Sequence, residues 1–326
     1  MKKALKIIGP PLFGIAVLVL FLSHFTPEQY RQIKQAILGA RYEFILLSIL
    51  MGLLSHVLRA LRWEQLLRTF TDKKLNKWNL IFAVGISYLM NLGIPRSGEI
   101  SRAVTVQKYE GLPFNKVLGT IITERIIDLV MLGLFVLLGL YLSHDEIARL
   151  LAPLIPRHPY MLAGMIPVLA AAAWFGMRML RRSGNRHLAR LYTFLNEIRT
   201  GMLSLAKIRR PWLFWLETAA IWSLYLLMLY VVMLAFPGTR HLGWDAVIMA
   251  FLAGSISIVI SNGGIGTYPV FVTETLMLYG VSKETGFAFS TVMWTAQTLM
   301  LIVAGILSFV FLPWTNRRRE ANPSRY

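Results

Sequence analysis

Long apolar runs, separated by short polar segments, set the pattern of the chain. An α-helix needs a run of about 20 apolar residues to cross the hydrocarbon core of a bilayer. The pattern therefore predicts an all-α, polytopic membrane helix bundle with about six full spans. We expect these spans over residues 7–25, 43–67, 117–142, 160–180, 212–236 and 286–312.

The composition supports this class and excludes others. Of the 326 residues, 56% are hydrophobic and 15% are charged, so we expect a single transmembrane domain over residues 1–326. Cysteine is absent, which excludes disulfides, a thiolate nucleophile and a thiolate-bound metal. The sequence contains no nucleotide-binding glycine loop, metal-ligand cluster or nucleophile–base pair. It therefore indicates no cofactor, no metal and no recognisable enzyme.

The net charge of +18 bears on orientation in the membrane. The basic residues gather in short loops between the apolar runs, a distribution that is typical of cytoplasmic loops. This distribution excludes nucleic acid as a partner. The most basic loop, over residues 181–211, should lie in the cytoplasm together with both termini. No small-residue cleavage site follows the first apolar run, so we expect that run to be retained as a helix.

Two apolar pieces, one in each half of the chain, are too short to cross a bilayer comfortably at about 1.5 Å per residue. All the basic loops lie in the cytoplasm if residues 78–110 and 245–279 form re-entrant helical hairpins that enter the membrane from opposite sides. Repeat one, about 4–142, and repeat two, about 160–312, are then inverted copies, which is a transporter design. The alternative is that one short piece crosses at a tilt and one basic loop breaks the orientation rule.

Ionisable side chains concentrate between Asn91 and Asp128, around a Gly-Ile-Pro break in the helical pattern. Ionisable groups at membrane depth are costly and usually functional. The segment from Asn91 to Gly93 can end one helix with glycine in a left-handed cap, and Pro95 or Ser97 can begin the next. A half-helix that begins near the midplane presents free backbone N–H groups to an anion. We therefore expect one wall of a polar pocket here.

The functional hypothesis for this break is a lipid phosphate held by backbone amides and by Arg96 and Arg102, with Ser97 and Glu99 as further candidate headgroup contacts. The planar guanidinium groups of these arginines suit phosphate oxygens. Glu99 lies in the first helical turn, where the helix dipole favours a negative charge. The alternative is internal pairing of Arg102 with Glu99, and of Arg96 with a carboxylate of the following helix.

That following helix carries two carboxylates, Glu124 and Asp128, at a spacing of four residues. Like charges at this spacing repel one another, so the pair needs a cation or a shared proton. An arginine would make the pair a structural link, and a shared proton would make it a charge relay. Arg125 projects from another part of the same helix and reaches either the interface or the pocket.

The second apolar run carries His56, Arg59 and Arg62 at three-residue spacing. Arg62 lies close to the expected cytoplasmic end of the run, so we expect its side chain to extend to the lipid headgroups. Arg59 lies deeper, which leaves a role in binding the headgroup open. We expect His56 to be a satisfied packing residue.

A glycine-rich break in the second half can form a second backbone cradle for the headgroup, because glycine permits close approach and an unwound turn. The alternative is a tight hairpin tip packed on a neighbouring helix. Thr267 is expected to cap the helix that follows, and Glu274 is the carboxylate near the middle of this half. The candidate headgroup contacts in the break are Asn262, Gly263, Gly264 and Gly266.

Three motifs carry a family resemblance. The sequences Pro-Arg-Ser-Gly-Glu-Ile-Ser-Arg at 95–102 and Thr-Glu-Arg-Ile-Ile-Asp at 123–128 resemble the signature of the lysylphosphatidylglycerol synthase transmembrane-region family, which are flippase-like membrane proteins. The break at 261–266 is similar to that family's Gly-Gly-x-Gly element. The resemblance implies a multi-pass protein of the bacterial cell (inner) membrane that moves polar lipids between leaflets. The chain departs from the family where Tyr268 and Pro269 replace a common Glu, and where Trp294, Thr295 and Gln297 lie in place of a common Arg.

Two functions remain open from the sequence. The first is a flippase- or scramblase-like translocator of a phosphate-bearing lipid, either an anionic phospholipid or an isoprenoid-linked lipid. The second is a membrane-embedded transferase, or the membrane partner of one, in lipid-linked glycan or aminoacyl-lipid synthesis. No ATPase motif is present, so a translocator would depend on ions, the membrane potential or lipid gradients.

Overall fold

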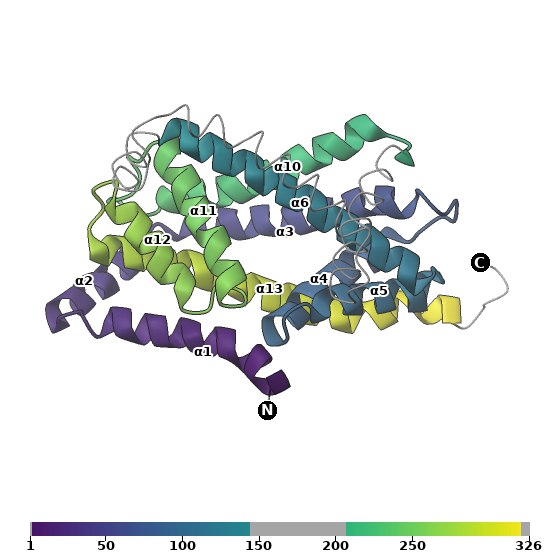
Figure 1. Cartoon of the computed structure of the whole chain (residues 1–326), viewed down its shortest axis with the longest axis horizontal. Helices are drawn as coiled ribbons and strands as arrows, with labels where there is room; N and C mark the ends of the chain where they lie inside the picture. Colours follow the sequence, from purple (N-terminus) through teal and green to yellow (C-terminus); the bar gives the residue numbers. More distant parts are fainter. Residues whose placement is uncertain (1, 144–206, 321–326) are drawn as a thin grey trace, which may run out of the picture.

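The computed structural model describes residues 2–143 and 207–320, and within these ranges the chain is helical without strands (Figure 1). The expected all-α, polytopic helix bundle is confirmed. The span expected at 160–180 and most of the basic loop at 181–211 lie outside the described residues. The described helices are α1 (Lys2–Leu22), α2 (Pro27–Leu38), α3 (Tyr42–Leu67), α4 (Lys77–Gly93), α5 (Ser97–Glu110), α6 (Phe114–Leu142), α10 (Pro211–Met233), α11 (Trp244–Ile260), α12 (Thr267–Met277) and α13 (Lys283–Glu320).

Four of the described helices, α3, α6, α10 and α13, are long and apolar enough to cross a membrane. Helices α1 and α2 supply a fifth span only if the two are counted together, and they are bent by 112°. The apolar pattern gave no indication of α2. Its first turn carries a capping box, in which Thr26 and Gln29 each bond the backbone of the other, and this motif fixes a new helix start after the bend.

Helices α4 and α5 form a helical hairpin. At the tip, the Gly98 N–H donates to Asn91 Oδ1 at 2.8 Å, and Ser97 Oγ donates to the Met90 carbonyl at 2.8 Å. At the other end, Lys73 Nζ donates to the Glu110 carbonyl at 2.9 Å, so the chain returns to the end from which it started. How this hairpin lies in a bilayer stays a prediction.

The expected left-handed cap at Gly93 is wrong. The backbone of Arg96 takes the left-handed conformation instead, with φ of 66°, and Ile94 ends α4 in extended conformation. Ile94 precedes Pro95, which favours extended backbone at that position. The turn back into α5 therefore comes after the proline.

Helices α11 and α12 form the second hairpin, and the backbone of its tip has four positive φ angles. They belong to Asn262, Gly263, Gly264 and Gly266. The expectation that Thr267 caps α12 is wrong, because Gly266 is the N-cap. The Thr267 hydroxyl donates to the Ser257 carbonyl of α11 at 3.1 Å and so ties the two arms of the hairpin together.

The two hairpins pack on different parts of the long helix α13, and their tips approach each other (Figure 1). A Cβ atom at Gly263 would lie 3.5 Å from Cδ2 of Leu92. One buried apolar cluster draws on α3 to α6 and on Phe214 of α10, and a second draws on α2, α3 and α10 to α13. The fold thus brings two breaks that are far apart in the sequence to one region of the bundle.

Candidate functional site

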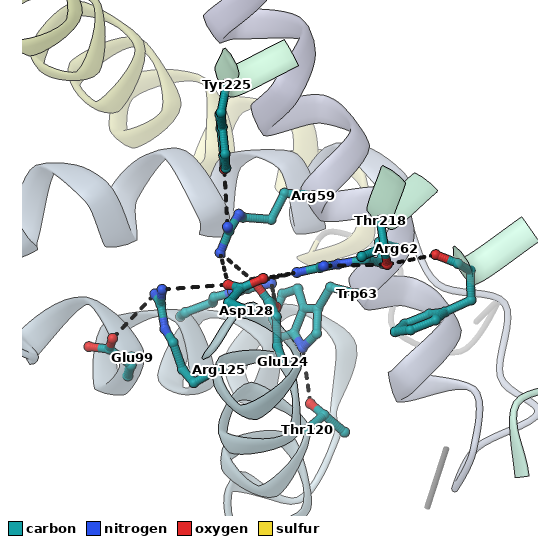
Figure 2. Close-up of polar contacts among 12 residues, drawn as sticks. Arg59, Arg62, Trp63, Glu99, Thr120, Glu124, Arg125, Asp128, Thr218 and Tyr225 are labelled. Carbon is teal, nitrogen blue, oxygen red and sulfur yellow. Dashed lines mark hydrogen bonds and ion pairs between the residues drawn. The ribbon is translucent and has the colours of Figure 1, made fainter. Parts of the chain in front are cut away.

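A network of buried ion pairs joins α3, α5 and α6 (Figure 2). Glu124 of α6 is fully buried and accepts hydrogen bonds from Arg59 Nη1 and from Arg102 Nη2, both at 2.8 Å. Asp128 accepts from Arg59 Nη1 at 3.0 Å and from Arg62 Nη2 at 2.9 Å. We call these five side chains the buried cluster.

Helical spacing explains why these side chains meet. Arg59 and Arg62 are three residues apart on α3, and Glu124 and Asp128 are four apart on α6, so each pair lies on one face of its helix. The contact between α3 and α6 then places both guanidinium groups against both carboxylates. Arg59 and Arg62 thus offset the repulsion between the two carboxylates. This arrangement corresponds to the alternative in which an arginine makes the carboxylate pair a structural link.

Each arginine of the buried cluster also has a partner outside it. The Arg102 guanidinium lies 3.7 Å from the centre of the Trp63 ring, in a cation–π contact. Trp63 Nε1 in turn donates to Thr120 Oγ1 at 3.0 Å. Arg59 Nη2 donates to the Tyr225 hydroxyl of α10 at 3.0 Å, so α10 is tied to the cluster as well.

The buried cluster contains one positive charge in excess, because three guanidinium groups face two carboxylates. The Nε atoms of all three arginines are buried and have no hydrogen-bond partner among the described residues. A buried N–H without a protein partner is normally satisfied by water or by a ligand. The cluster therefore holds an excess positive charge and three buried donors without a partner among the described residues.

A fourth arginine lies at the rim of the cluster. Arg125 Nη2 lies 3.3 Å from Glu99 Oε1 of α5, and its Nη1 lies 3.9 Å from Asp128 Oδ2. The side chains of Arg125 and Glu99 are 43% and 24% exposed, in contrast to the buried arginines. Figure 2 shows Arg125 between Glu99 and the buried carboxylates. The rim pair thus connects the surface to the buried cluster.

A comparison with known protein families gives the family of the chain. The family model described as the lysylphosphatidylglycerol synthase TM region matches residues 7–305. The chain belongs to this family. Searches of curated proteins and of solved structures found no match. With its apolar helices, this member of the lysylphosphatidylglycerol synthase transmembrane-region family is a multi-pass membrane protein concerned with lipid.

The pairing in this family member differs from two expectations. Arg102 binds Glu124 rather than Glu99, which pairs with Arg125 instead. The expectation that Arg62 extends to the headgroups is wrong, because its side chain is fully buried and bound to Asp128. For Arg62, the attraction to the two buried carboxylates is stronger than the solvation that its guanidinium would gain at the end of the helix.

Three other predicted site residues lie apart from the buried cluster. Arg96 and Glu274 are exposed, and neither forms an ion pair or hydrogen bond among the described residues. Ser97 uses its hydroxyl to close the tip of the first hairpin. The expected pairing of Arg96 with a carboxylate of α6 is therefore not found.

The glycine break is occupied by contacts within the chain. Trp294 Nε1 of α13 donates to the Gly263 carbonyl at 2.9 Å. A Cβ atom at Gly264 would lie 2.9 Å from Tyr268 Cβ, and one at Gly266 would collide with the Gly14 carbonyl of α1. Asn262 Nδ2 is buried and has no partner among the described residues. These contacts match the packed hairpin tip, and a role in headgroup binding stays a prediction.

His56 packs against the Tyr88 ring, with ring centres 4.4 Å apart. Its two ring nitrogens are buried and have no partner among the described residues, so the expected satisfaction of this histidine is wrong. The sequence did not predict the contacts that Trp63, Thr120 and Tyr225 make with the charged network. These residues come from three helices, and nothing in their local sequence indicates a polar partner.

Proposed function

We propose that the protein is a flippase- or scramblase-like translocator of a polar, phosphate-bearing lipid. In this proposal the headgroup enters the charged network while the acyl tails stay in the bilayer. The observation that carries the proposal is the excess guanidinium charge of the buried cluster, with three Nε donors that have no partner among the described residues. Arginine clusters with this donor geometry suit phosphate oxygens.

The energetics favour an anionic ligand over an empty cluster. An unbalanced charge inside an apolar bundle is costly, and a phosphate oxygen offsets the third guanidinium. The lipid classes that fit are anionic phospholipids and isoprenoid-linked lipids, both of which carry phosphate. In this proposal the binding partner of the protein is the lipid itself, and an enzyme that modifies the same lipid is a second partner.

The proposed location is the bacterial inner membrane, with both termini in the cytoplasm. The basic distribution of the loops supports this orientation. The two helical hairpins, whose tips approach each other, support a transporter-like arrangement in which half-helices meet near the midplane. A headgroup bound there would have a polar contact halfway between the leaflets.

The test is transbilayer movement of a fluorescent phosphatidylglycerol in proteoliposomes. The wild-type protein should accelerate movement over protein-free vesicles, and Arg59→Lys should slow it by about tenfold. Lysine keeps the charge but loses the fork that holds Glu124, Asp128 and Tyr225 together. Arg31→Lys, in an exposed ion pair on α2, should leave the rate unchanged. Wild-type movement no faster than in protein-free vesicles would remove the proposal.

A further inference from the structure

The rim arginine, Arg125, is held differently from the buried arginines. Its two ion-pair distances are 3.3 and 3.9 Å, whereas each buried arginine has a contact of 2.8 or 2.9 Å to a carboxylate. Its side chain is 43% exposed. Exposed, loose ion pairs contribute little to stability, whereas breaking a buried pair is costly. Exchange of partners should therefore begin at Arg125.

The partner of Arg125 is incompletely satisfied. Glu99 directs Oε1 towards Arg125, while its Oε2 is buried and has no hydrogen-bond partner among the described residues. The carboxylate lies in the first turn of α5, so it also holds negative charge at the helix N-terminus. Glu99 therefore competes with any second anion for the Arg125 guanidinium.

Exposed apolar side chains flank the rim pair on both helices. Leu129, one turn from Arg125 on α6, is 68% exposed. On α5, Ile100 and Val104 are 55% and 48% exposed, and they follow closely after Glu99. A charged pair bordered by apolar surface fits a ligand with an anionic head and hydrocarbon tails, and a free anion would make no use of that surface.

We propose that the Glu99–Arg125 ion pair is an exchangeable lock on the entrance to the buried cluster. Arg125 leaves Glu99 to bind the phosphate of an incoming membrane lipid, and Glu99 competes with that phosphate for the guanidinium. Arg59, Arg62 and Arg102 keep their carboxylates during this first contact. The inference rests on the proposed function for the class of ligand, and it adds the residue that meets the lipid first and the residue that opposes it.

The experiment is native mass spectrometry of the purified full-length protein titrated with phosphatidylglycerol. Arg125→Gln should weaken binding by about tenfold, through loss of a charge-assisted contact. Glu99→Gln should strengthen binding by about threefold, because the competing charge is gone. The double variant should bind as weakly as Arg125→Gln alone, and Arg125→Lys should retain most of the affinity. Thermal unfolding of each variant checks that it is folded.

The matched controls are Glu28→Gln and Arg31→Gln, which break an exposed ion pair of the same kind on α2 and should leave binding unchanged. The lock is overturned if Glu99→Gln weakens binding as Arg125→Gln does, since the intact pair would then form the site. Displacement of the lipid by inorganic phosphate alone would show a free-anion site and would also overturn it. If the variants shift lipid binding but the wild-type protein does not translocate lipid, the proposed function is wrong and the lock stands. If the protein translocates lipid but the variants do not shift binding, the lock is wrong and the proposed function stands.

Discussion

Arg59 of α3 and Glu124 of α6 are 65 residues apart in the sequence, yet their side chains form a 2.8 Å ion pair inside the bundle. Both side chains are almost completely buried. Taking two charges out of water is costly, and their attraction repays that cost only with good geometry and further hydrogen bonds. The additional contacts of Arg59 to Asp128 and Tyr225 provide those bonds.

The first prediction concerns the stability that this network provides. Glu124→Gln should lower the free energy of unfolding by about 3–5 kcal/mol, because buried arginines lose the carboxylate that balances them. Tryptophan fluorescence during thermal unfolding in detergent measures the change. Glu43→Gln removes a carboxylate from an exposed ion pair at the start of α3 and should lower the unfolding midpoint far less. Equal midpoints for the two variants would show that the network contributes nothing to stability.

The second prediction concerns the packing of α1 on the second hairpin. Gly266 has φ of 74°, and a Cβ there would collide with the Gly14 carbonyl. Gly280 has a similar φ of 80°, but a Cβ added there would meet no atom within 4 Å. Both alanine variants carry backbone strain, of about 1 kcal/mol. Gly266→Ala should therefore lower the unfolding midpoint further than Gly280→Ala, and a smaller effect at Gly266 would contradict the α1 contact.

The third prediction concerns the first hairpin in the membrane. The chain has no cysteine, so single cysteines can be introduced at will. Lys74 and Lys108 are exposed near the two outer ends of the α4–α5 hairpin. A membrane-impermeant thiol reagent should label Lys74→Cys and Lys108→Cys from the cytoplasmic side alone. Labelling of the two positions from opposite sides would mean that the segment crosses the membrane once.

Much of the fold could be predicted from local patterns. Apolar length indicates α3, α6, α10 and α13, because a spanning helix must match the bilayer. The Gly-Ile-Pro break and the glycine break indicate where the two hairpins turn, since each contains residues that end or unwind helices. Most boundaries of these four helices differ by at most three residues, as the fraying of helix ends leads one to expect. Helix α13 is the exception, because it continues to Glu320, eight residues past the expected end.

The pairing within the site could not be predicted in the same way. The sequence places Glu124 and Asp128 on one helix face, but it does not say which arginine reaches them. The position of Arg62 near the end of its apolar run predicted contact with the lipid headgroups. The packing of α3 against α6 buries its side chain instead. Such contacts depend on how each helix is rotated towards its neighbours, and the pattern of apolar residues in a single helix does not determine that rotation.

A structure of the protein in lipid nanodiscs that contain phosphatidylglycerol would show directly whether the charged network binds a lipid headgroup. We expect a lipid phosphate within hydrogen-bond distance of Arg125, with the acyl chains along the apolar surface beside Leu129. Glu99 should then have moved away from the guanidinium. A structure in which Arg125 keeps Glu99 and every headgroup lies at the membrane surface would contradict both the lock and the proposed function.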